Sequence, residues 1–356
     1  MPFFILSINP GSTSTKIALY KDEQSIYSCN IEHSPEELKP FKKIIDQFLF
    51  RKDIILKELK NAHVDINMLH AIVGRGGMLK PMESGVYEMN ARLHEDLIIG
   101  IQGQHASSLG GLIAESLVAH IPGARAFIAD PVVVDEMQDV ARVSGHALFH
   151  RKSLFHALNH KAIGRLYAKN TGSKYENLRL VIAHLGGGVS VGAHYMGRVI
   201  DVNDGINGTG PFSSNRAGQL AAADVAKLCF SGTYTLDDVL LMINGKGGAM
   251  SLIGTSDLRW VEKMATEGDK QAQLVMDALA YNVAKEIGAM AAVLEGKVDA
   301  ILLTGGIAYS TYIVEYITKM VSFIAPVQVF AGEDEMAALA MNGLAVLHGQ
   351  PCKIYT

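Results

Sequence analysis

The chain opens with two apolar segments that are joined by a short turn rich in glycine, serine and threonine. Residues 3–8 read FFILSI, residues 9–14 read NPGSTS, and residues 15–19 read TKIAL. Apolar runs bounded by turn residues are typical of β-strands. Backbone amides and hydroxyl groups at such a turn can surround a phosphate, and Lys16 adds a positive charge. The opening therefore predicts a strand–turn–strand unit that binds phosphate.

Similar turns follow apolar segments at two later places. Residues 181–185 (VIAHL) precede three glycines, and residues 300–304 (AILLT) precede two more. From Leu178 onward the chain also repeats the order of its opening, with three strands followed by helices and further strands. Three such turns in this order suggest a nucleotide held from two sides. We therefore expect a duplicated α/β architecture with a nucleotide cleft between two domains.

The pattern of apolar residues and turn signals predicts the elements in more detail. In the first half we expect three strands within residues 1–33, a long helical region from Ser34 to about Asn61, a strand at 70–73, helices within 90–120 and a strand at 126–131. In the second half we expect strands at 180–185, 189–194, 198–202, 300–304 and 327–330, helices at 221–230, 236–243 and 269–294, and a final helix opened by the acidic run at 333–335. The predicted domains are 1–150 plus 337–356 and 151–336.

Size and charge narrow the function classes. A chain of 356 residues is expected to form about two domains. Its formal net charge of −4 provides no basic field for nucleic acid or anionic lipid, so phosphate binding must be local. The three cysteines are far apart, and no secretory or membrane-spanning segment is apparent. We expect a cytoplasmic protein that binds neither nucleic acid nor membrane.

Motifs along nearly the whole chain resemble those of the acetate kinase family. The segment Asn9 to Lys16 (NPGSTSTK) is similar to the family's opening N-x-G-S-S-S-x-K, and its form and the shorter chain resemble the butyrate kinase branch. Further matches are Asp130-Pro131, Leu154-Phe155-His156, His184 to Gly188, Asn215 to Gly218, Gly254 to Arg259, Thr304 to Ile307 and Glu333 to Met336. Neither a Walker A motif nor a G-x-G-x-x-G after the first strand is present.

The resemblance implies the actin-like fold shared by sugar kinases, Hsp70 and actin. It implies a reversible transfer of the γ-phosphoryl group of ATP to a short-chain carboxylate, with Mg²⁺ as cofactor and ADP and an acyl phosphate as products. Within the butyrate kinase branch the acid is butyrate. A homodimer or larger homo-oligomer is also expected. Acetate, propionate or branched acids are the alternative substrates.

The resemblance also assigns roles to particular residues. Catalytic roles fall on Asp130, Arg75, His156 and Arg216, and Mg²⁺ on Asn9 and Glu335, although Glu333 or Asp334 remain alternatives to Glu335. Nucleotide and phosphate binding fall on Gly11, Ser12, Thr13, Ser14, Lys16, His184, Gly186, Gly187, Gly188, Ser256, Asp257, Leu258, Gly305, Gly306 and Ile307. The acyl pocket is expected to include Gly74, Arg75 and Phe155.

Several of these residues could instead have a purely structural role, with no part in binding or catalysis. Asn9 can be a turn residue, Asp130 can cap a strand end, and Gly305-Gly306 can be a close-packed turn. The acidic run at 333–335 is favourable at any helix N-terminus. His160, four residues after His156 on a helix-like stretch, is expected to be a buried histidine with satisfied hydrogen bonds.

The chemistry of the acceptor limits the role of Asp130. Carboxylic acids have pKa values of about 4, so the acceptor is already ionised near neutral pH and no strong general base is needed. We therefore expect Asp130 to position Mg²⁺ or the carboxylate. Repulsion between the carboxylate and the phosphates must be offset by cations, for which Arg75 and Arg216 are the candidates.

The chain departs from the acetate kinase family in two places: one is the segment where that family reads H-R-V-V-H-G-G, and the other is the glycine turn after residues 181–185. Residues 71–77 read AIVGRGG, so Arg75 is displaced along the turn and Gly74 stands where that family has valine. The loss of that side chain is expected to leave room for a longer acid. Gly187 replaces an asparagine, which removes one side-chain donor to phosphate.

Other classes of function remain open at this stage. One is a sugar or hydroxyl kinase of the same fold. Another is a nucleotide-driven interaction protein similar to a chaperone or to actin. A third is a transcriptional regulator built on a kinase fold, which would need an added DNA-binding module.

Overall fold

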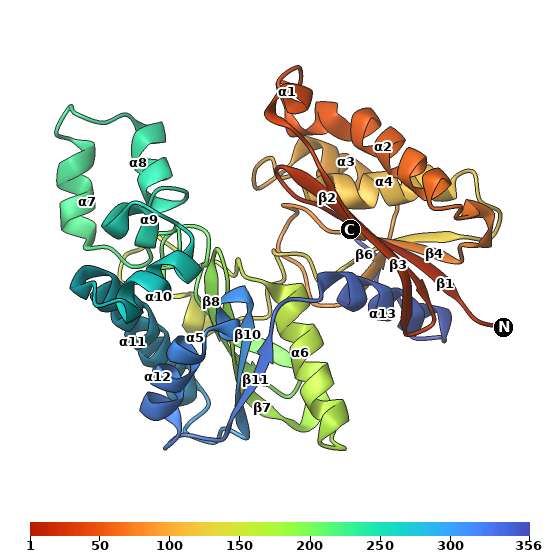
Figure 1. The fold of residues 1–356 in the computed structure, drawn as a ribbon. Helices are drawn as coiled ribbons and strands as arrows, with labels where there is room; N and C mark the ends of the chain where they lie inside the picture. The colour runs from red at the N-terminus through yellow and green to blue at the C-terminus, as the bar shows by residue number, and fades with distance from the viewer. The chain divides into compact units, whose positions relative to one another are not determined.

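The computed structural model describes residues 1–356 and divides the chain into two compact units (Figure 1). Unit 1 comprises Met1–Val134 and Asp334–Thr356, and unit 2 comprises Asp135–Glu333. The first boundary lies earlier than the expected one at residue 150. The reason is that the segment after Val134 bonds to a strand of unit 2: Gln138 N–H donates to Ile200 O at 3.0 Å, and Arg151 pairs with Asp201 at 2.7 Å.

Unit 1 is built on a six-stranded sheet. Its order is β3 (Gln24–Glu32), β2 (Ser14–Lys21), β1 (Phe4–Pro10), β4 (Ala71–Arg75), β6 (Arg125–Ala129) and β5 (Val86–Glu88). β1 is antiparallel to β2, as β2 is to β3, whereas β1, β4 and β6 are parallel to one another. The predicted strand–turn–strand opening is confirmed.

Unit 2 repeats this arrangement in its five-stranded sheet. Its order is β9 (Arg198–Val202), β8 (Val189–Tyr195), β7 (Arg179–Leu185), β10 (Ala300–Gly305) and β11 (Val327–Ala331). Antiparallel pairs join β7, β8 and β9, and parallel pairs join β7, β10 and β11. Each strand therefore has a counterpart of the same direction in unit 1, and the duplicated α/β organisation is confirmed.

Helices cover both faces of the sheet in unit 1. They are α1 (Pro35–Leu38), α2 (Phe48–Asn61), α3 (Ala91–Ile99), α4 (Ser108–Val118) and α13 (Glu335–Leu347), with short 3₁₀ turns at Ile44–Gln47 and Ile66–Met68. α4 and α13 pack on opposite faces, as Figure 1 shows. The helical region expected from Ser34 to about Asn61 is not continuous: it is divided into α1, a 3₁₀ turn and α2, because Pro40 lies two residues after α1 and a proline disfavours helical geometry in the residue before it.

Unit 2 contains more helices than unit 1, and some of them form layers on the two faces of its sheet. The helices are α5 (Asp139–Arg142), α6 (Ala157–Asn170), α7 (Ala222–Cys229), α8 (Leu236–Ile243), α9 (Gly248–Ile253), α10 (Leu258–Thr266), α11 (Lys270–Val293) and α12 (Thr311–Val321), with 3₁₀ turns at Tyr175–Asn177 and Gly306–Tyr309. Alternate residues of β7 and β10 face opposite layers. Leu180 and Leu302 pack with α6, whereas Val181 and Leu303 pack with α11.

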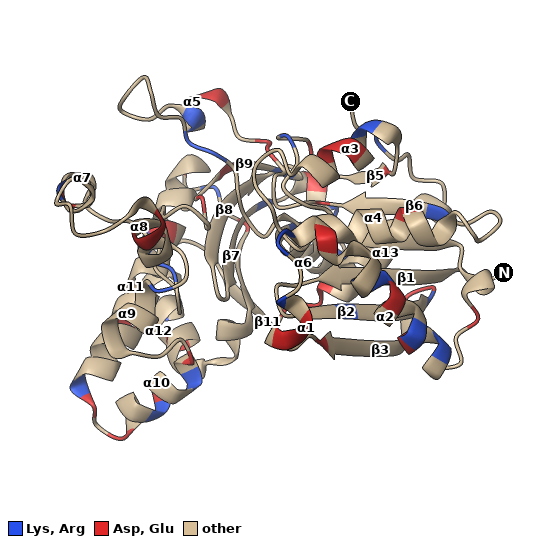
Figure 2. Ribbon diagram, turned by 90° about the horizontal axis from the view of Figure 1, so that it is seen from above, with Lys and Arg blue, Asp and Glu red and all other residues tan.

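In Figure 2 the charged residues lie mainly on helices and loops, with Lys and Arg interspersed among Asp and Glu. The strands β1 and β8 carry no charged residue. None of the helices combines the length and the apolar character that crossing a bilayer requires.

Helix α4 approaches the sheet of unit 1 closely at one glycine. A Cβ atom added at Gly74 would lie 2.1 Å from the carbonyl carbon of Gly110, so neither backbone can give way easily. We expect Gly74→Ala to lower the free energy of unfolding by about 3 kcal/mol through overpacking, measured by urea denaturation. Gly288→Ala, inside α11, is the control and should have the opposite effect. Nothing lies within 4 Å of the added Cβ there, so the free energy of unfolding should rise by about 1 kcal/mol. A stable Gly74→Ala protein would contradict this packing.

Candidate functional site

Three predicted site residues lie at one edge of the sheet in unit 1. Asn9 is near the end of β1, Arg75 ends β4, and Asp130 directly follows β6. These strands are parallel neighbours, so their carboxyl ends meet at the same edge, which is the usual location of ligand sites in open α/β sheets. Strand direction and order thus bring together residues that are far apart in the sequence.

The carboxylate of Glu335 joins two of these residues to the first turn of α13. Arg75 Nη1 lies 2.9 Å from Glu335 Oε1, and Asn9 Nδ2 donates to Oε2 at 2.5 Å. The side chains of Arg75 and Glu335 are only 19% and 12% exposed. Asn9 and Arg75 meet α13 because alternate residues of a strand share a face: Ile5 packs on α13, and Ser7 Oγ donates to Met336 O.

The other two acids of the 333–335 run lie elsewhere. Asp334 caps α13 by accepting a hydrogen bond from Ala337 N–H at 2.9 Å. Glu333 belongs to unit 2, where its carboxylate lies 3.7 Å from Nε2 of His184. Among the three candidates, only the first-turn residue Glu335 therefore shares a cluster with Asn9.

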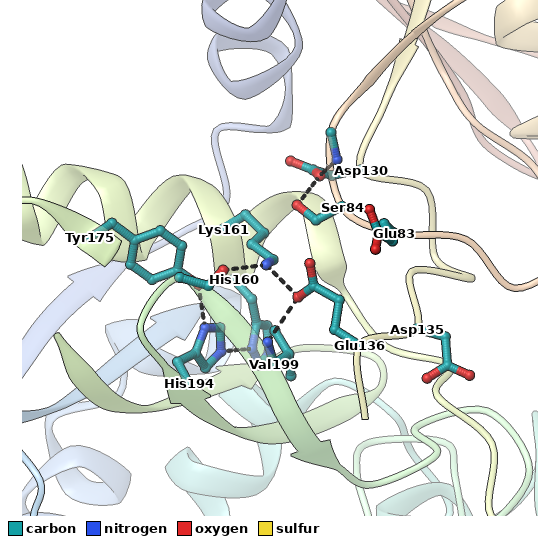
Figure 3. Close-up of polar contacts among 12 residues, drawn as sticks. Glu83, Ser84, Asp130, Asp135, Glu136, His160, Lys161, Tyr175, His194 and Val199 are labelled. Atoms are coloured by element: carbon teal, nitrogen blue, oxygen red, sulfur yellow. Dashed lines mark hydrogen bonds and ion pairs between the residues drawn. The ribbon is translucent and has the colours of Figure 1, made fainter. Parts of the chain in front are cut away.

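Asp130 is buried and held in an unusual backbone conformation. It is 2% exposed, its φ is 39°, and its Oδ1 accepts hydrogen bonds from Ser84 Oγ at 2.6 Å and Gly85 N–H at 2.8 Å. Figure 3 shows the contact with Ser84. A left-handed conformation in a residue other than glycine is strained, and such strain is often found at functional sites. The bonds fix the direction of the carboxyl group.

Arg51, which the sequence analysis missed, forms hydrogen bonds to the backbone of the turn of residues 11–14. Arg51 comes from α2, is 0% exposed, and donates to the carbonyl oxygens of Ser12 at 3.1 Å and Ser14 at 2.9 Å. It also donates to Thr15 Oγ1 at 2.9 Å and to Gln47 Oε1. All of these partners are neutral, and burial lowers the pKa of the Arg51 guanidinium to about 10. Only the contact between helix and turn reveals it, because an arginine in a helix normally reads as a surface residue.

Ser12 and Thr13 in this turn are exposed, whereas Gly11 and Ser14 are partly buried. Lys16 is exposed, and its Cα lies opposite that of Asn9 in the β1–β2 pair, so both side chains are on one face. Gly74 points to the other face, toward α4, and its close approach to Gly110 is a packing reason for glycine there. The acyl-pocket role of Gly74 stays a prediction.

The glycine turn after β7 in unit 2 contacts an arginine and a serine. A Cβ atom at Gly188 would lie 2.1 Å from Nη1 of Arg216, and Ser213 Oγ donates to Gly187 O at 2.6 Å. Arg216 also donates to Gly205 O, and burial lowers the pKa of its guanidinium. Space around Gly187 is open, with nothing within 4 Å of an added Cβ, and an added Cβ at Gly186 would meet the ring of His184.

Two predicted histidines lie face to face beside this turn. The rings of His156 and His184 are stacked with centroids 3.8 Å apart. His184 Nδ1 bonds to Asn159 Oδ1 at 2.9 Å, and His156 Nδ1 lies 2.9 Å from Ser190 Oγ. Phe155 is buried and meets His160 edge to face at 5.1 Å. The structure thus groups His156, His184 and the second glycine turn within unit 2.

The remaining predicted nucleotide residues lie at two element ends of unit 2. Asp257 caps α10 and pairs with the exposed Arg259 at 2.9 Å, with Ser256 before it and Leu258 as the first helical residue. Gly305 ends β10 with a φ of 90°, and its added Cβ would clash with Leu185 O at 2.4 Å. Gly306, by contrast, has open space, and with Ile307 it begins a 3₁₀ turn. Their roles in nucleotide binding stay predictions.

The fold is that of the acetate kinases. The structure of Porphyromonas gingivalis acetate kinase matches with a TM-score of 0.81 at 20% identity, covering 97% of this chain and 100% of that one. A propionate kinase from Francisella tularensis matches with a TM-score of 0.76 at 19% identity, over 96% of this chain and 98% of that one. The predicted actin-like kinase fold is confirmed.

Relatives of similar length establish the family. The chain is 53% identical to butyrate kinase 2 and 52% identical to butyrate kinase 1 of Clostridium acetobutylicum, over 98% and 97% of both chains. A probable butyrate kinase of Bacteroides thetaiotaomicron is 50% identical over 99% of both. The model of the acetokinase family matches residues 141–329. The chain belongs to the acetokinase family, as its motifs indicated.

We expect Arg51→Met to loosen the turn of residues 11–14 and to lower the free energy of unfolding by about 3 kcal/mol, because the partly buried carbonyl oxygens of Ser12 and Ser14 and the buried Thr15 Oγ1 lose their donor. The matched control is Lys57→Met, which replaces an exposed cation of the same helix and should change stability by less than about 0.5 kcal/mol. Urea denaturation measures both. Equal effects of the two substitutions would show that the guanidinium does not hold the turn.

Proposed function

We propose that the protein phosphorylates butyrate, using ATP and forming ADP and butyryl phosphate in a reversible reaction. The observation that carries the proposal is identity of 50% or more with three butyrate kinases or probable butyrate kinases over nearly their whole length. In the reaction a carboxylate oxygen forms a bond to the γ-phosphorus, and the bond between that phosphorus and the β,γ-bridging oxygen breaks as ADP leaves.

Charge is the main difficulty of this reaction, and the chain offers two arginines for it. Arg75 is held in unit 1 by Glu335 and Asn9, and Arg216 is held in unit 2 by Gly205 O. We assign Arg75 to the acyl carboxylate and Arg216 to the transferring phosphoryl group, where fixed cations offset charge at no cost of reorganisation. Asp130, with its direction fixed by Ser84 and Gly85, orients the acceptor and does not need to accept a proton.

The residues around Glu335 fit a magnesium ion. Mg²⁺ prefers oxygen ligands, keeps several waters and is usually bound by one or two carboxylates together with phosphate oxygens. The Glu335 carboxylate and Oδ1 of Asn9 are such oxygens; in the structure the carboxylate accepts a hydrogen bond from Asn9 Nδ2, and Asn9 Oδ1 lies 3.4 Å from Arg75 Nη1. When bound there, Mg²⁺ would neutralise charge on the phosphates. Glu335 and Asn9 would hold it, and Arg75 would then keep its charge for an anion.

The glycine-rich turns supply backbone and side-chain donors for the nucleotide, to which Lys16 adds a positive charge. We assign Gly11, Ser12, Thr13, Ser14 and Lys16 to phosphate in unit 1, supported by the rigid carbonyl contacts of Arg51. In unit 2 we assign His184 and the Gly186–Gly188 turn to phosphate. Ser256, Asp257, Leu258, Gly305, Gly306 and Ile307 are assigned to the adenosine, and Phe155 to the acyl pocket.

We further propose that the enzyme works in the cytoplasm as a homo-oligomer, as the family resemblance implies. Its three cysteines, Cys29, Cys229 and Cys352, are free thiols in the structure, which suits a reducing compartment.

The function is tested by incubating the enzyme with Mg·ATP, hydroxylamine and acids of two to five carbons. Acyl phosphates form hydroxamates whereas sugar phosphates do not, so the assay separates acyl kinases from hydroxyl kinases. We expect the highest kcat/KM with butyrate and a modest loss for neighbouring acids, since each buried methylene contributes about 0.8 kcal/mol. Hydroxamate absent with every acid would refute the proposal, and a preference for acetate would refute the assignment to butyrate.

Arg216→Ala should lower kcat by about a hundredfold and change the KM for ATP much less, because the guanidinium is assigned to charge that develops in the transition state. Steady-state kinetics with butyrate provides the measurement. Arg198→Ala, at an exposed arginine of β9, is the control and should leave both constants unchanged. Equal losses in turnover and ATP affinity would show that Arg216 merely binds ground-state nucleotide.

A further inference from the structure

A continuous chain of hydrogen bonds runs through the interior of unit 2 and ends at His156. Tyr175 OH lies 2.6 Å from His194 Nδ1, and His194 Nε2 lies 3.1 Å from His160 Nδ1. His160 Nε2 lies 2.9 Å from Ser190 Oγ, which is also 2.9 Å from His156 Nδ1. Figure 3 shows the part formed by Tyr175, His194 and His160. Each of these four hydrogen bonds joins two side-chain atoms.

The fold places this chain in the layer between α6 and the sheet. Ser190 and His194 are alternate residues of β8, so they share one face, and His160 comes from the facing helix α6. Between them on the same face is Gly192, whose added Cβ would lie 3.4 Å from both His160 Nδ1 and His194 Nε2. Gly192 thus lies directly beside the contact between the two imidazoles.

Both internal histidines are neutral. His160 and His194 are fully buried, and burial holds the pKa of each well below its usual range, with the charge of Lys161 acting in the same direction. Lys161 itself is paired with Glu136 at 2.6 Å, as Figure 3 shows. A neutral imidazole has one donor nitrogen and one acceptor nitrogen. Each of these two histidines therefore accepts a hydrogen bond at one ring nitrogen and donates one from the other, so the hydrogen bonds on its two sides point the same way along the chain.

The tyrosine at the far end gives the chain its direction. A phenol is a good donor, since it is weakly acidic with a pKa of about 10, and an imidazole nitrogen with a lone pair is a good acceptor. With Tyr175 donating to His194 Nδ1, the proton of His194 is on Nε2 and donates to His160. The proton of His160 is then on Nε2 and donates to Ser190, whose hydroxyl donates to His156 Nδ1.

We propose that Tyr175 is a positioning residue for His156: through His194, His160 and Ser190 it keeps the proton of His156 on Nε2. We assign His156, to which the family resemblance gives a catalytic role, to the transferring phosphoryl group, so that its Nε2–H is offered there in a fixed direction with no proton transferred. The tautomer of a histidine is commonly set by the bond that its other nitrogen makes. This inference rests on the proposed function for its consequence in catalysis, but not for the tautomer itself.

The tautomer is measured directly by nitrogen NMR on the unliganded enzyme labelled with ¹⁵N-histidine, with His156 assigned from His156→Gln. We expect Nδ1 of His156 to be unprotonated and Nε2 to be protonated. Tyr175→Phe removes the donor that sets the direction, so both tautomers of His156 should become populated. A wild-type His156 that is protonated on Nδ1, or a Tyr175→Phe spectrum identical to that of the wild type, would overturn the proposal.

Kinetics tests the consequence. Tyr175→Phe should lower kcat about tenfold, in the range found for groups that orient a functional histidine, with the KM values for ATP and butyrate nearly unchanged. Tyr167→Phe is the matched control, because Tyr167 packs against the same apolar cluster as Tyr175; its kcat should equal that of the wild type. Loss of kcat in both variants would indicate a packing effect.

A double substitution tests whether Tyr175 and Ser190 act on His156 through the same chain of hydrogen bonds. Ser190→Ala cuts the last link, so it should lower kcat by a factor similar to that of Tyr175→Phe. The double variant should be no slower than Ser190→Ala, because both changes act by one route. Multiplied losses would contradict the chain. If the wild-type enzyme forms no acyl hydroxamate, the proposed function fails, whereas the tautomer measured in the spectrum still tests the chain.

Discussion

The geometry of parallel strands is the constraint on which both halves of this structure depend. In unit 1 the parallel strands β1, β4 and β6 end at one sheet edge, and in unit 2 β7, β10 and β11 do the same. Functional candidates therefore meet although long stretches of sequence separate them. Glu335 bonds to Asn9, which lies 326 residues earlier, because α13 returns to the face of β1 on which Asn9 lies. The last helix completes a site that the first strand begins.

The parts of the fold that the sequence predicts are those with local causes. The strand–turn–strand segments at 3–19 and 181–194 form because apolar runs flank glycine-rich turns, and that signal needs no distant contact. The helix start at Ser34 is also local, with the serine and Glu37 capping each other. The break in the helical region after this start was not predicted, because the amphipathic pattern continues past Pro40. The boundary after Val134 was missed for a different reason, since pairing with Ile200 decides it.

Residues whose role depends on distant contacts were not predictable. Arg51 reads as an exposed helix residue, and only the packing of α2 under the turn makes it a buried donor to Ser12 and Ser14. Tyr175 and His194 carry no motif, and their connection to His156 requires the register of β7 with β8 and the position of α6. Gly74 has a packing role that the sequence alone does not reveal, because the backbone of Gly110 occupies the space that a Cβ atom there would need.

The arginines show how the chain keeps cations available for an anion. Arg51 is bound only by neutral oxygens, so its positive charge beneath the first turn is not cancelled by a carboxylate. Coulomb interactions are stronger where water is excluded, so an uncancelled buried charge acts over a longer range than an exposed one. Arg75 differs because Glu335 compensates its charge at 2.9 Å. It can attract a carboxylate strongly only when another cation meets the charge of Glu335. Under the proposed function, metal binding and acceptor binding in unit 1 are therefore coupled through a single carboxylate.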